Sequence, residues 1–310
     1  MNNSLYKYLK YKNKYINSKK LILGGSSVNY NNNNNNNIIL CGTHNNRLEC
    51  YFKHLNKNND YPNKSFNNCV IIRCYKENNK AKFNMIYEGE TNGDNNISLC
   101  SMTNGCWDIV SFNNYFNNHS YDITLPNNTE IFLIRHGLGV HNKMNILQKI
   151  LNTKIDSQLD PIGLEQAMRA GIFLKGYIYS NMNIIFMASH LMRAQQTIAI
   201  IMKMIEIKKQ IYIVPCSHEL IYSGNGNCDS NILQNLPVAS NMPTCTDNSG
   251  TCGKLNIFSD PNTLDNYEVN LNWDYYMEFY NNNNNFGWHI SKCQDTNMVS
   301  EIIKIFSFNN

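Results

Sequence analysis

Short runs of consecutive apolar residues recur along the chain of 310 residues, and polar residues follow each run. The clearest runs cover residues 38–41, 131–134, 184–188 and 211–214. Apolar runs without polar alternation predict strands that are buried on both faces, as in a parallel sheet. The spacing of apolar side chains predicts helices over residues 45–55, 161–178 and 298–306, and another that begins near Leu191. The pattern therefore predicts an α/β fold with a mostly parallel sheet and helices on both faces.

One pair of apolar segments differs from this alternation of strands and helices. Residues 69–75 and 82–87 flank the polar stretch 76–80. Two such segments joined by a short polar loop predict an antiparallel hairpin. We expect this hairpin at one edge of the sheet, because the other predicted strands are connected by helices.

Two polar residues mark the expected starts of helices. Asp160 is a favourable N-cap residue, and Pro161 suits the first helical position. Ser189 directly follows the run 184–188 and is placed to cap the next helix. This boundary puts Arg193 in the first turn of that helix, near the carboxyl end of the preceding strand.

Arg135, His136 and Gly137 directly follow the run 131–134. They place a guanidinium group and an imidazole ring side by side. Residues just past the carboxyl end of a parallel strand line the ligand crevice of an open α/β sheet. A neutral imidazole can attack phosphorus and hold the phosphoryl group covalently, and guanidinium groups match the geometry of phosphate oxygens. The simpler interpretation is a strand end with two solvated polar residues and a turn glycine.

Three further blocks follow this tripeptide: Asn142, then residues 159–167 (LDPIGLEQA), then residues 189–197 (SHLMRAQQT). In this order the blocks resemble the histidine phosphatase family, which includes the cofactor-dependent phosphoglycerate mutases. The resemblance implies catalysis without a metal ion or another cofactor. A glutamate or glutamine is frequent in the family where this chain has Leu138, which argues against mutase activity.

The resemblance assigns roles to individual residues. It implies that His136 is the nucleophile, that Arg135, Arg193 and Asn142 bind the phosphate, and that Glu219 protonates the leaving oxygen. Glu219 follows the run 211–214, where the family carries its acid. The alternatives are a solvated helix arginine at position 193 and an ordinary loop carboxylate at position 219.

The family also needs a second histidine at the end of a later strand, and the segment after Glu219 offers no such strand. The matching block lies near the amino terminus, where an apolar strand ends in His44 and a predicted helix follows, with Asn45 where a glycine is common. We therefore predict a circular permutation in which residues 38–90 supply the carboxyl-terminal part of the fold and His44 joins the phosphate site. The alternative is a strand-end histidine in an unrelated small domain.

The predicted organisation is a basic, asparagine-rich flexible tail followed by one histidine phosphatase-like domain. The tail covers residues 1–37 and the domain residues 38–310. Within the domain the parts are the second-histidine part (38–90), an insertion (91–129) and the nucleophile part (130–310), which contains a polar insertion (221–270).

Composition limits the compartments and the classes of binding partner that we expect for the protein. A net charge of +4 is modest and gives no footprint for nucleic acid. No run approaches the ~20 apolar residues of a membrane span, and the first residues lack the apolar core of a signal peptide, so we expect a cytoplasmic protein. The asparagine runs and the lysine- and tyrosine-rich beginning resemble proteins of giant DNA viruses, in which case the location is the host cytoplasm or the virion. Cys41, Cys69 and Cys74 lie in predicted strands, as small buried side chains in a reducing compartment do.

The sequence thus predicts a phosphomonoester hydrolase that acts through a phosphohistidine on His136. The expected partner is a phosphorylated small molecule or a phosphoprotein, with no nucleic acid and no membrane span. The alternative is a catalytically inactive member of the same fold that binds phosphorylated ligands or a protein partner.

Overall fold

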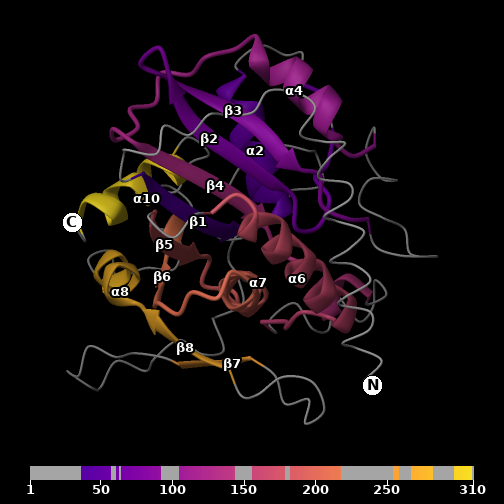
Figure 1. Cartoon of the computed structure of the whole chain (residues 1–310), viewed down its shortest axis with the longest axis vertical. Coiled ribbons are helices and arrows are strands. Elements are labelled where there is room, and N and C mark those ends of the chain that lie inside the picture. Colours follow the sequence, from indigo (N-terminus) through magenta and orange to yellow (C-terminus); the bar gives the residue numbers. More distant parts are fainter. Residues whose placement is uncertain are drawn as a thin grey trace.

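The structure is a computed structural model that describes residues 36–56, 61–62, 64–91, 105–143, 156–178, 182–217, 254–257, 267–281 and 297–308. Its centre is an 8-stranded sheet with the strand order β3-β2-β4-β1-β5-β6-β8-β7, which runs from top to bottom in Figure 1. The strands are β1 (Asn37–Thr43), β2 (Ile71–Glu77), β3 (Lys80–Tyr87), β4 (Thr129–Arg135), β5 (Asn183–Ala188), β6 (Ile211–Ile213), β7 (Lys254–Ile257) and β8 (Tyr267–Asn272). The α-helices are α2 (Asn45–Leu55), α4 (Ile109–Asn117), α6 (Pro161–Lys175), α7 (Met192–Met204), α8 (Asp274–Asn281) and α10 (Asn297–Phe308), and the 3-10 helices are η1 (Val140–Lys143) and η2 (Pro215–Ser217).

Parallel pairing dominates the middle of the sheet. Neighbouring strands pair in parallel from β4 through β1, β5 and β6 to β8. The hairpin of β2 and β3 is antiparallel and lies at one edge, and β7 pairs with β8 in antiparallel fashion at the other. The predicted α/β fold, with a mostly parallel sheet and an antiparallel edge hairpin, is confirmed.

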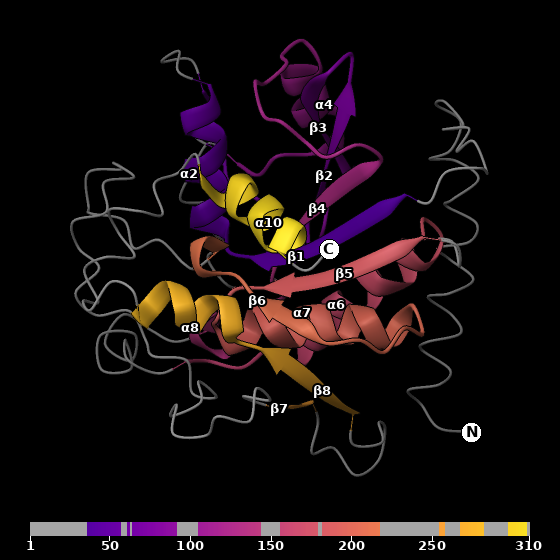
Figure 2. The same cartoon turned by 90° about the vertical axis from the view of Figure 1, so that its left-hand side faces the viewer.

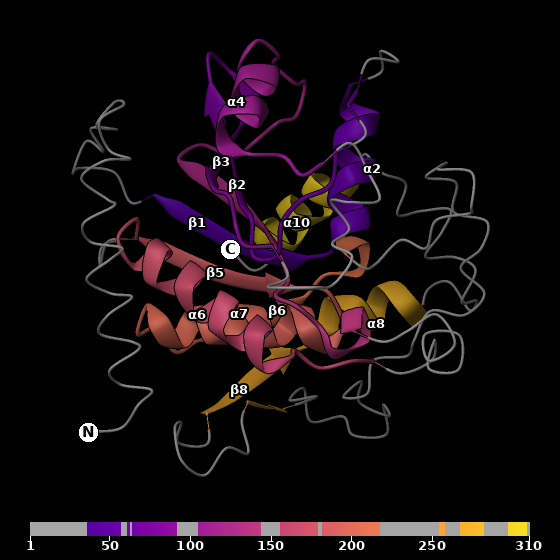
Figure 3. The same ribbon diagram turned by 90° about the vertical axis from the view of Figure 1, so that its right-hand side faces the viewer.

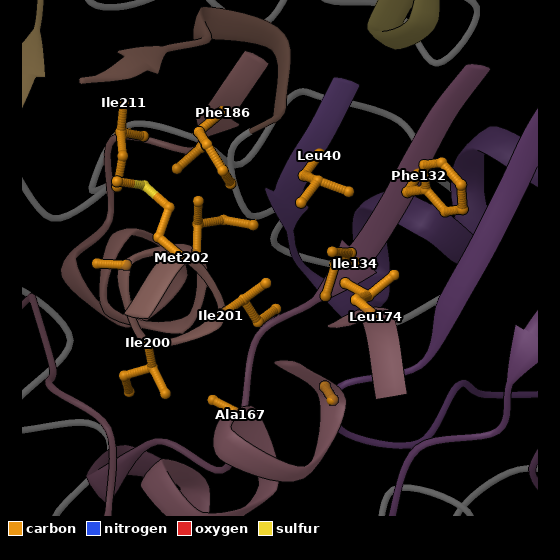
Figure 4. Packing of buried hydrophobic residues seen from close by; sticks show 14 of the residues in the cluster. Leu40, Phe132, Ile134, Ala167, Leu174, Phe186, Ile200, Ile201, Met202 and Ile211 are labelled. Carbon is orange, nitrogen blue, oxygen red and sulfur yellow. The ribbon is translucent and has the colours of Figure 1, made fainter. Parts of the chain in front are cut away.

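Two hydrophobic cores cover the two faces of the sheet. Side chains alternate along β1, so Ile38 and Leu40 pack in the core beneath α6 and α7, while Ile39 and Cys41 pack in the core beneath α2, α4 and α10. Each of these four side chains is at most 1% exposed. Figures 2 and 3 show α6 and α7 on one side of the sheet and α2 and α10 on the other. The predicted helices on both faces are therefore confirmed, and Figure 4 shows the core beneath α6 and α7.

A glycine lets α7 cross close to the carboxyl end of β1. A Cβ atom on Gly42 would lie 2.8 Å from Cγ1 of Ile198 and 3.0 Å from the carbonyl oxygen of Ala194. Glycine inside a strand weakens it unless another segment needs the space. Here the close approach brings the first turns of α7 next to the end of β1.

The turn of the β2–β3 hairpin is tighter than the five polar residues 76–80 suggest. The strands extend to Glu77 and from Lys80, so that only Asn78 and Asn79 remain in the turn. Both asparagines have positive φ angles, 50° and 62°. Asparagine tolerates this left-handed backbone, which a two-residue turn of type I′ requires at both positions.

The structure contains several elements in the predicted insertions that no continuous apolar run in the sequence indicated. Strand β7 lies in the polar segment 221–270, β8 begins in it, and α4 lies in the segment 91–129. In β8 only Val269 and Leu271 are buried, so the strand has the alternating pattern of a sheet with one solvated face rather than a continuous apolar run. None of the described helices is long and apolar enough to cross a lipid bilayer.

An aromatic cluster joins α2 to the hairpin and to α4. The ring centroid of Phe52 lies 5.1 Å from that of Phe83, 5.5 Å from that of Phe112 and 5.0 Å from that of Phe116. Phe52 is fully buried. Because these rings come from separate segments, their contacts tie the first part of the chain to the insertion that contains α4.

We expect Phe52→Ala to lower the free energy of unfolding by about 3–5 kcal/mol, because a large cavity would open in the cluster. Urea denaturation of both proteins measures this difference. Val110→Ala on α4 is the matched control, since Val110 is 67% exposed, and a change within about 0.5 kcal/mol is expected there. An equally small effect of Phe52→Ala would contradict the packing described.

Candidate active site

The register of three parallel strands sets the positions of the candidate residues. Thr43 at the end of β1 pairs with Arg135 at the end of β4, and the N–H of His136 donates to the carbonyl oxygen of Thr43 at 3.0 Å. Neighbouring strands lie about 4.8 Å apart, so the first residues beyond their ends are also neighbours. The ring centroids of His44 and His136 are accordingly 4.9 Å apart. Two histidines from distant parts of the chain thus meet at the carboxyl edge of the sheet.

His136 is 2% exposed, and both of its ring nitrogens have partners. Nδ1 lies 2.6 Å from the carbonyl oxygen of Gly137, and Nε of Arg193 donates to Nε2 at 3.2 Å. A carbonyl oxygen only accepts and a guanidinium only donates. The proton of the neutral ring therefore sits on Nδ1, and the lone pair of Nε2 points toward the guanidinium of Arg193.

Arg193 lies in the first turn of α7 and is 5% exposed. Thr197, four residues further along the helix, donates to the backbone carbonyl oxygen of Arg193 at 2.8 Å and accepts from the N–H of Gly137 at 3.1 Å. Residues four apart lie on the same face of a helix, so Thr197 is next to Arg193. Its hydroxyl supports the backbone of Arg193 rather than the guanidinium, and it joins α7 to the turn after His136.

Arg135 is 4% exposed, and its guanidinium Nη1 donates to the carbonyl oxygen of Phe66. The N–H of Phe66 in turn donates to Oδ1 of Asn45 at 2.9 Å, and Nδ2 of Asn45 donates to a carboxylate oxygen of Glu49 at 2.5 Å. This buried chain of hydrogen bonds joins the end of β4 to the first turn of α2. The side chain that stands where the resembling family has glycine therefore has a structural use in this protein.

His44 is the N-cap residue of α2 and is fully buried. Its Nε2 lies 2.9 Å from Oγ of Ser189, the residue that follows β5. The N–H of Ser189 donates to the carbonyl oxygen of Gly42 at 2.9 Å, which places Ser189 beside the end of β1. The first turns of α2 and α7 thus both begin at this edge of the sheet, where helix N-termini favour an anion.

The start of α7 differs from the predicted start. Leu191 is the N-cap residue, and Oδ1 of Asp156 accepts from the N–H of Met192 at 2.8 Å. The hydroxyl oxygen of Ser189 accepts from the N–H of Leu191 at 3.3 Å, one residue before the helix. The prediction that Ser189 caps α7 is wrong because Asp156 takes the first helical donor. The predicted cap of α6 is correct, since Asp160 accepts from the N–H of Ile162 at 3.0 Å.

The turn after His136 packs tightly against α6. The N–H of Leu138 donates to Oε1 of the fully buried Gln166 at 2.9 Å. Asn142, the predicted phosphate ligand in η1, is half-buried, and its Oδ1 accepts from the N–H of Gly139 at 3.0 Å. This bond shapes the turn, and the role of Asn142 in phosphate binding stays a prediction.

Glu219, the predicted acid, lies outside the described residues.

The described part of the site is rich in cationic and imidazole groups. The guanidinium groups of Arg135 and Arg193 and the rings of His44 and His136 are all at least 95% buried. Buried positive charge favours an anion far more strongly than exposed charge does. Within the described ranges, no group of three or more histidine, cysteine, aspartate or glutamate side chains could hold a metal ion.

Cysteine chemistry does not fit this site. Cys69 lies beside it, since its N–H donates to the carbonyl oxygen of His136 at 3.4 Å, but burial raises the pKa of its thiol. A protonated thiol is a poor nucleophile.

Cys41, Cys69 and Cys74 are free and buried, as the sequence suggested, whereas Cys50 and Cys106 are each disulfide-bonded. Disulfides are uncommon in a reducing compartment, so the cytoplasmic location stays a prediction.

Two partners of the site residues were missed in the sequence: Phe66, which accepts from Arg135, and Ser189, which contacts His44. Phe66 contributes only backbone groups to the site, and such groups leave no trace in the residue types. Ser189 was assigned to a helix cap, although aligning the runs 38–43 and 184–188 as neighbouring parallel strands would have placed it beside His44. The missing information was therefore the strand order rather than the chemistry.

A comparison with known families agrees with this geometry. The fold and the site define an α/β protein with a cationic, histidine-containing site at the carboxyl edge of its sheet. Residues 131–219 match the family model of the histidine phosphatase superfamily (branch 1). The match supports that superfamily, and with it a phosphatase or mutase type of activity in general. No curated protein and no solved structure matches the chain significantly.

The contact between the turn and α6 gives a testable result. A Cβ atom on Gly163 would lie 2.1 Å from the carbonyl oxygen of Leu138. Replacing a helical glycine with alanine usually stabilises a protein by about 0.5–1 kcal/mol. For Gly163→Ala we expect the opposite, a decrease of about 1–3 kcal/mol in the free energy of unfolding. The new methyl group would meet the backbone of Leu138, which cannot move aside as a flexible side chain can.

Urea denaturation measures this loss, and Ile162→Ala is the matched control on the same helix because Ile162 is 38% exposed. The control should change the free energy of unfolding by no more than about 0.5 kcal/mol. A more stable Gly163→Ala variant would show that the turn does not pack against α6 as described.

Proposed function

We propose that the protein hydrolyses phosphomonoesters through a phosphohistidine on His136. The observation that carries this proposal is the state of the His136 ring. Its proton is held on Nδ1 by the carbonyl oxygen of Gly137, and its Nε2 lone pair faces Arg193. A neutral, oriented imidazole whose lone pair points at a phosphate-binding group is what a phosphoryl-accepting nucleophile requires.

The proposed reaction has two steps. In the first, Nε2 of His136 attacks phosphorus and the bond to the leaving oxygen breaks, which transfers the phosphoryl group to the ring. The Nδ1–H of His136 stays hydrogen-bonded to Gly137 while the ring gains positive charge. In the second step, water attacks the phosphorus of the phosphohistidine as the P–N bond breaks, and the carboxylate that protonated the leaving oxygen takes a proton from the water. Inorganic phosphate is released, and the ring and the acid return to their starting states.

The cationic groups stabilise the charge that develops on the phosphoryl oxygens. In our proposal the guanidinium of Arg193 moves from Nε2 of His136 to a phosphate oxygen when substrate binds. Arg135, held by the carbonyl oxygen of Phe66, and His44 bind the remaining oxygens with Asn142. Arg135 and His44 are already held in place and so cost little reorganisation, which is the main source of the catalytic effect of such donors.

We propose Glu219 as the acid that protonates the leaving oxygen. Its support is its position in the sequence after β6, within the segment that matches the superfamily. A carboxyl group serves this role if its pKa lies near the working pH.

Hydrolysis is favoured over a mutase reaction by the turn after His136. Leu138 stands where the resembling family often has glutamate or glutamine, and its side chain is 2% exposed. A buried apolar side chain offers no polar group to hold a phosphorylated intermediate during its transfer back to a substrate oxygen. We therefore favour water as the final acceptor of the phosphoryl group.

We infer the substrate class from charge. The polar segment 221–270 contains Lys254 as its single lysine and no arginine or histidine. A ligand with many phosphate groups would need further cations around it. The proposed substrate is therefore a singly phosphorylated small molecule or a phosphoprotein side chain.

We also propose that the fold is a circular permutation of the resembling family. In support, β1 lies between β4 and β5 in parallel with both, and the residue after it is His44, next to His136. The family has this second-histidine strand after the acid, whereas in this chain it precedes the nucleophile. A circular permutation joins the original chain ends, which often lie close together, and opens the chain at another point. The packing of the strands stays the same.

We expect His136→Ala to lower kcat for a generic aryl phosphate by at least about a thousandfold, because the attacking atom is removed. His54→Ala is the matched control, since His54 is exposed in the last turn of α2. Thermal unfolding of both variants shows whether the fold is kept. Wild-type turnover by His136→Ala would exclude His136 as the nucleophile.

If the wild-type chain has no turnover with a panel of phosphomonoesters, the inactive binding protein is the better interpretation. Calorimetry with inorganic phosphate then tests for binding in the wild type and for its loss in Arg193→Ala.

His44→Ala tests the permutation directly. We expect kcat to fall about 10²–10³-fold, the usual effect of removing one donor that stabilises a transition state. His54→Ala again serves as the control, because both residues belong to the same helix and its cap. Unchanged kinetics in His44→Ala would mean that residues 38–90 do not supply the second histidine of the family's site.

A further inference from the structure

Ser189 makes a contact that the proposed reaction does not yet use. Its Oγ lies 2.9 Å from Nε2 of His44, and the N–H of Leu191 donates to the same oxygen at 3.3 Å. Ser189 and His44 are both fully buried. The contact is therefore shielded from water and involves a hydroxyl with one lone pair already occupied.

A serine hydroxyl has one O–H donor and two lone pairs. With one lone pair occupied by the N–H of Leu191, the O–H can donate to Nε2 of a neutral His44 ring. Among the described residues this nitrogen is the only acceptor for the buried O–H, so a neutral ring with its proton on Nε2 would leave the hydroxyl donor unsatisfied. When the ring is charged, the second lone pair of Ser189 can accept from Nε2–H. In the neutral ring the proton must then be on Nδ1, and in the charged ring both nitrogens carry a proton. Nδ1 is a donor in both states.

We propose that Ser189 is a positioning residue that holds His44 as an Nδ1–H donor toward the phosphate. This inference rests on the proposed function, because it assumes that His44 binds the phosphoryl oxygens. Nε2 is engaged by Ser189, so Nδ1 is the ring nitrogen that can donate to a phosphate oxygen. The serine thereby makes the binding capacity of His44 independent of whether the ring is charged.

The serine does not act as a nucleophile in this proposal. Its side chain is fully buried between the ends of β1 and β5, and its oxygen accepts from the start of α7. Attack on phosphorus would require the hydroxyl to leave both of these contacts. Attack by His136 requires only that the guanidinium of Arg193 move from Nε2 to the phosphate, as proposed above.

Other ionisable groups surround His44, whereas the contact with Ser189 bears on which ring nitrogen carries the proton. The buried titratable or charged side chains on the elements around His44, within the described ranges, are Arg47 and Glu49 on α2, Arg135 and His136 after β4, Asp156 before α6, His190 after β5, Arg193 on α7 and Glu301 on α10. Nε2 of His44 is in contact with Ser189 at 2.9 Å.

Nuclear magnetic resonance of ¹⁵N-labelled histidine tests the proposal without any measurement of activity. In the wild-type chain at a pH where His44 is neutral, we expect the signals of an Nδ1–H ring. Ser189→Ala should shift the ring toward the Nε2–H form, and Ser189→Thr, which keeps the hydroxyl, should restore the wild-type signals. An Nδ1–H ring in Ser189→Ala would overturn the proposal whether or not the protein is a phosphatase.

Kinetics test the same idea in the active protein. Ser189→Ala should lower kcat for an aryl phosphate by about 10–100-fold, the usual effect of removing a hydrogen-bond partner that orients a functional histidine. The loss should grow as the pH rises, because a neutral ring that lacks the Ser189 hydroxyl is free to place its proton on Nε2. Ser189→Thr should recover most of the activity.

A loss that is the same at every pH would count against the proposal, because it would indicate a merely structural role. If Ser189→Thr does not fold, the pH dependence of Ser189→Ala decides alone. Failure of the proposed function is distinguishable, because a chain without turnover still gives the resonance result.

Discussion

The parallel pairing of β4, β1 and β5 is the constraint on which the site depends. Parallel strands end at the same edge of a sheet, so the residues after neighbouring strands lie one strand spacing apart. His136, His44 and Ser189 are the residues after these three strands, and they form a row at that edge. Apolar packing on both faces fixes the register, since a shift by one residue would turn every buried side chain to the wrong core.

Burying so much positive charge has a cost that hydrogen bonds to the backbone partly offset. Arg135 donates to the carbonyl oxygen of Phe66 and His136 lies within hydrogen-bond distance of that of Gly137, while Thr197 supports the backbone of Arg193. These contacts use neutral partners rather than carboxylates. These contacts hold the donor groups in fixed positions, which suits a site for an anion.

Much of this could be predicted from the sequence, because apolar runs specify the strands and the residues after them carry the chemistry. The strands that end before His44 and His136 and the helix capped by Asp160 are examples. Strand β8 was missed because its polar alternation resembles a loop. The partner of His44 was missed because Ser189 also suited a helix cap, and only the strand order separates these two uses.

The most direct test of the account is to trap the covalent intermediate. Rapid acid-free quenching after mixing with a ³²P-labelled phosphomonoester, followed by peptide mapping, locates the labelled residue. The account predicts an acid-labile, alkali-stable label on His136. Label on another residue, or release of phosphate by a chain that never carries label, would contradict it.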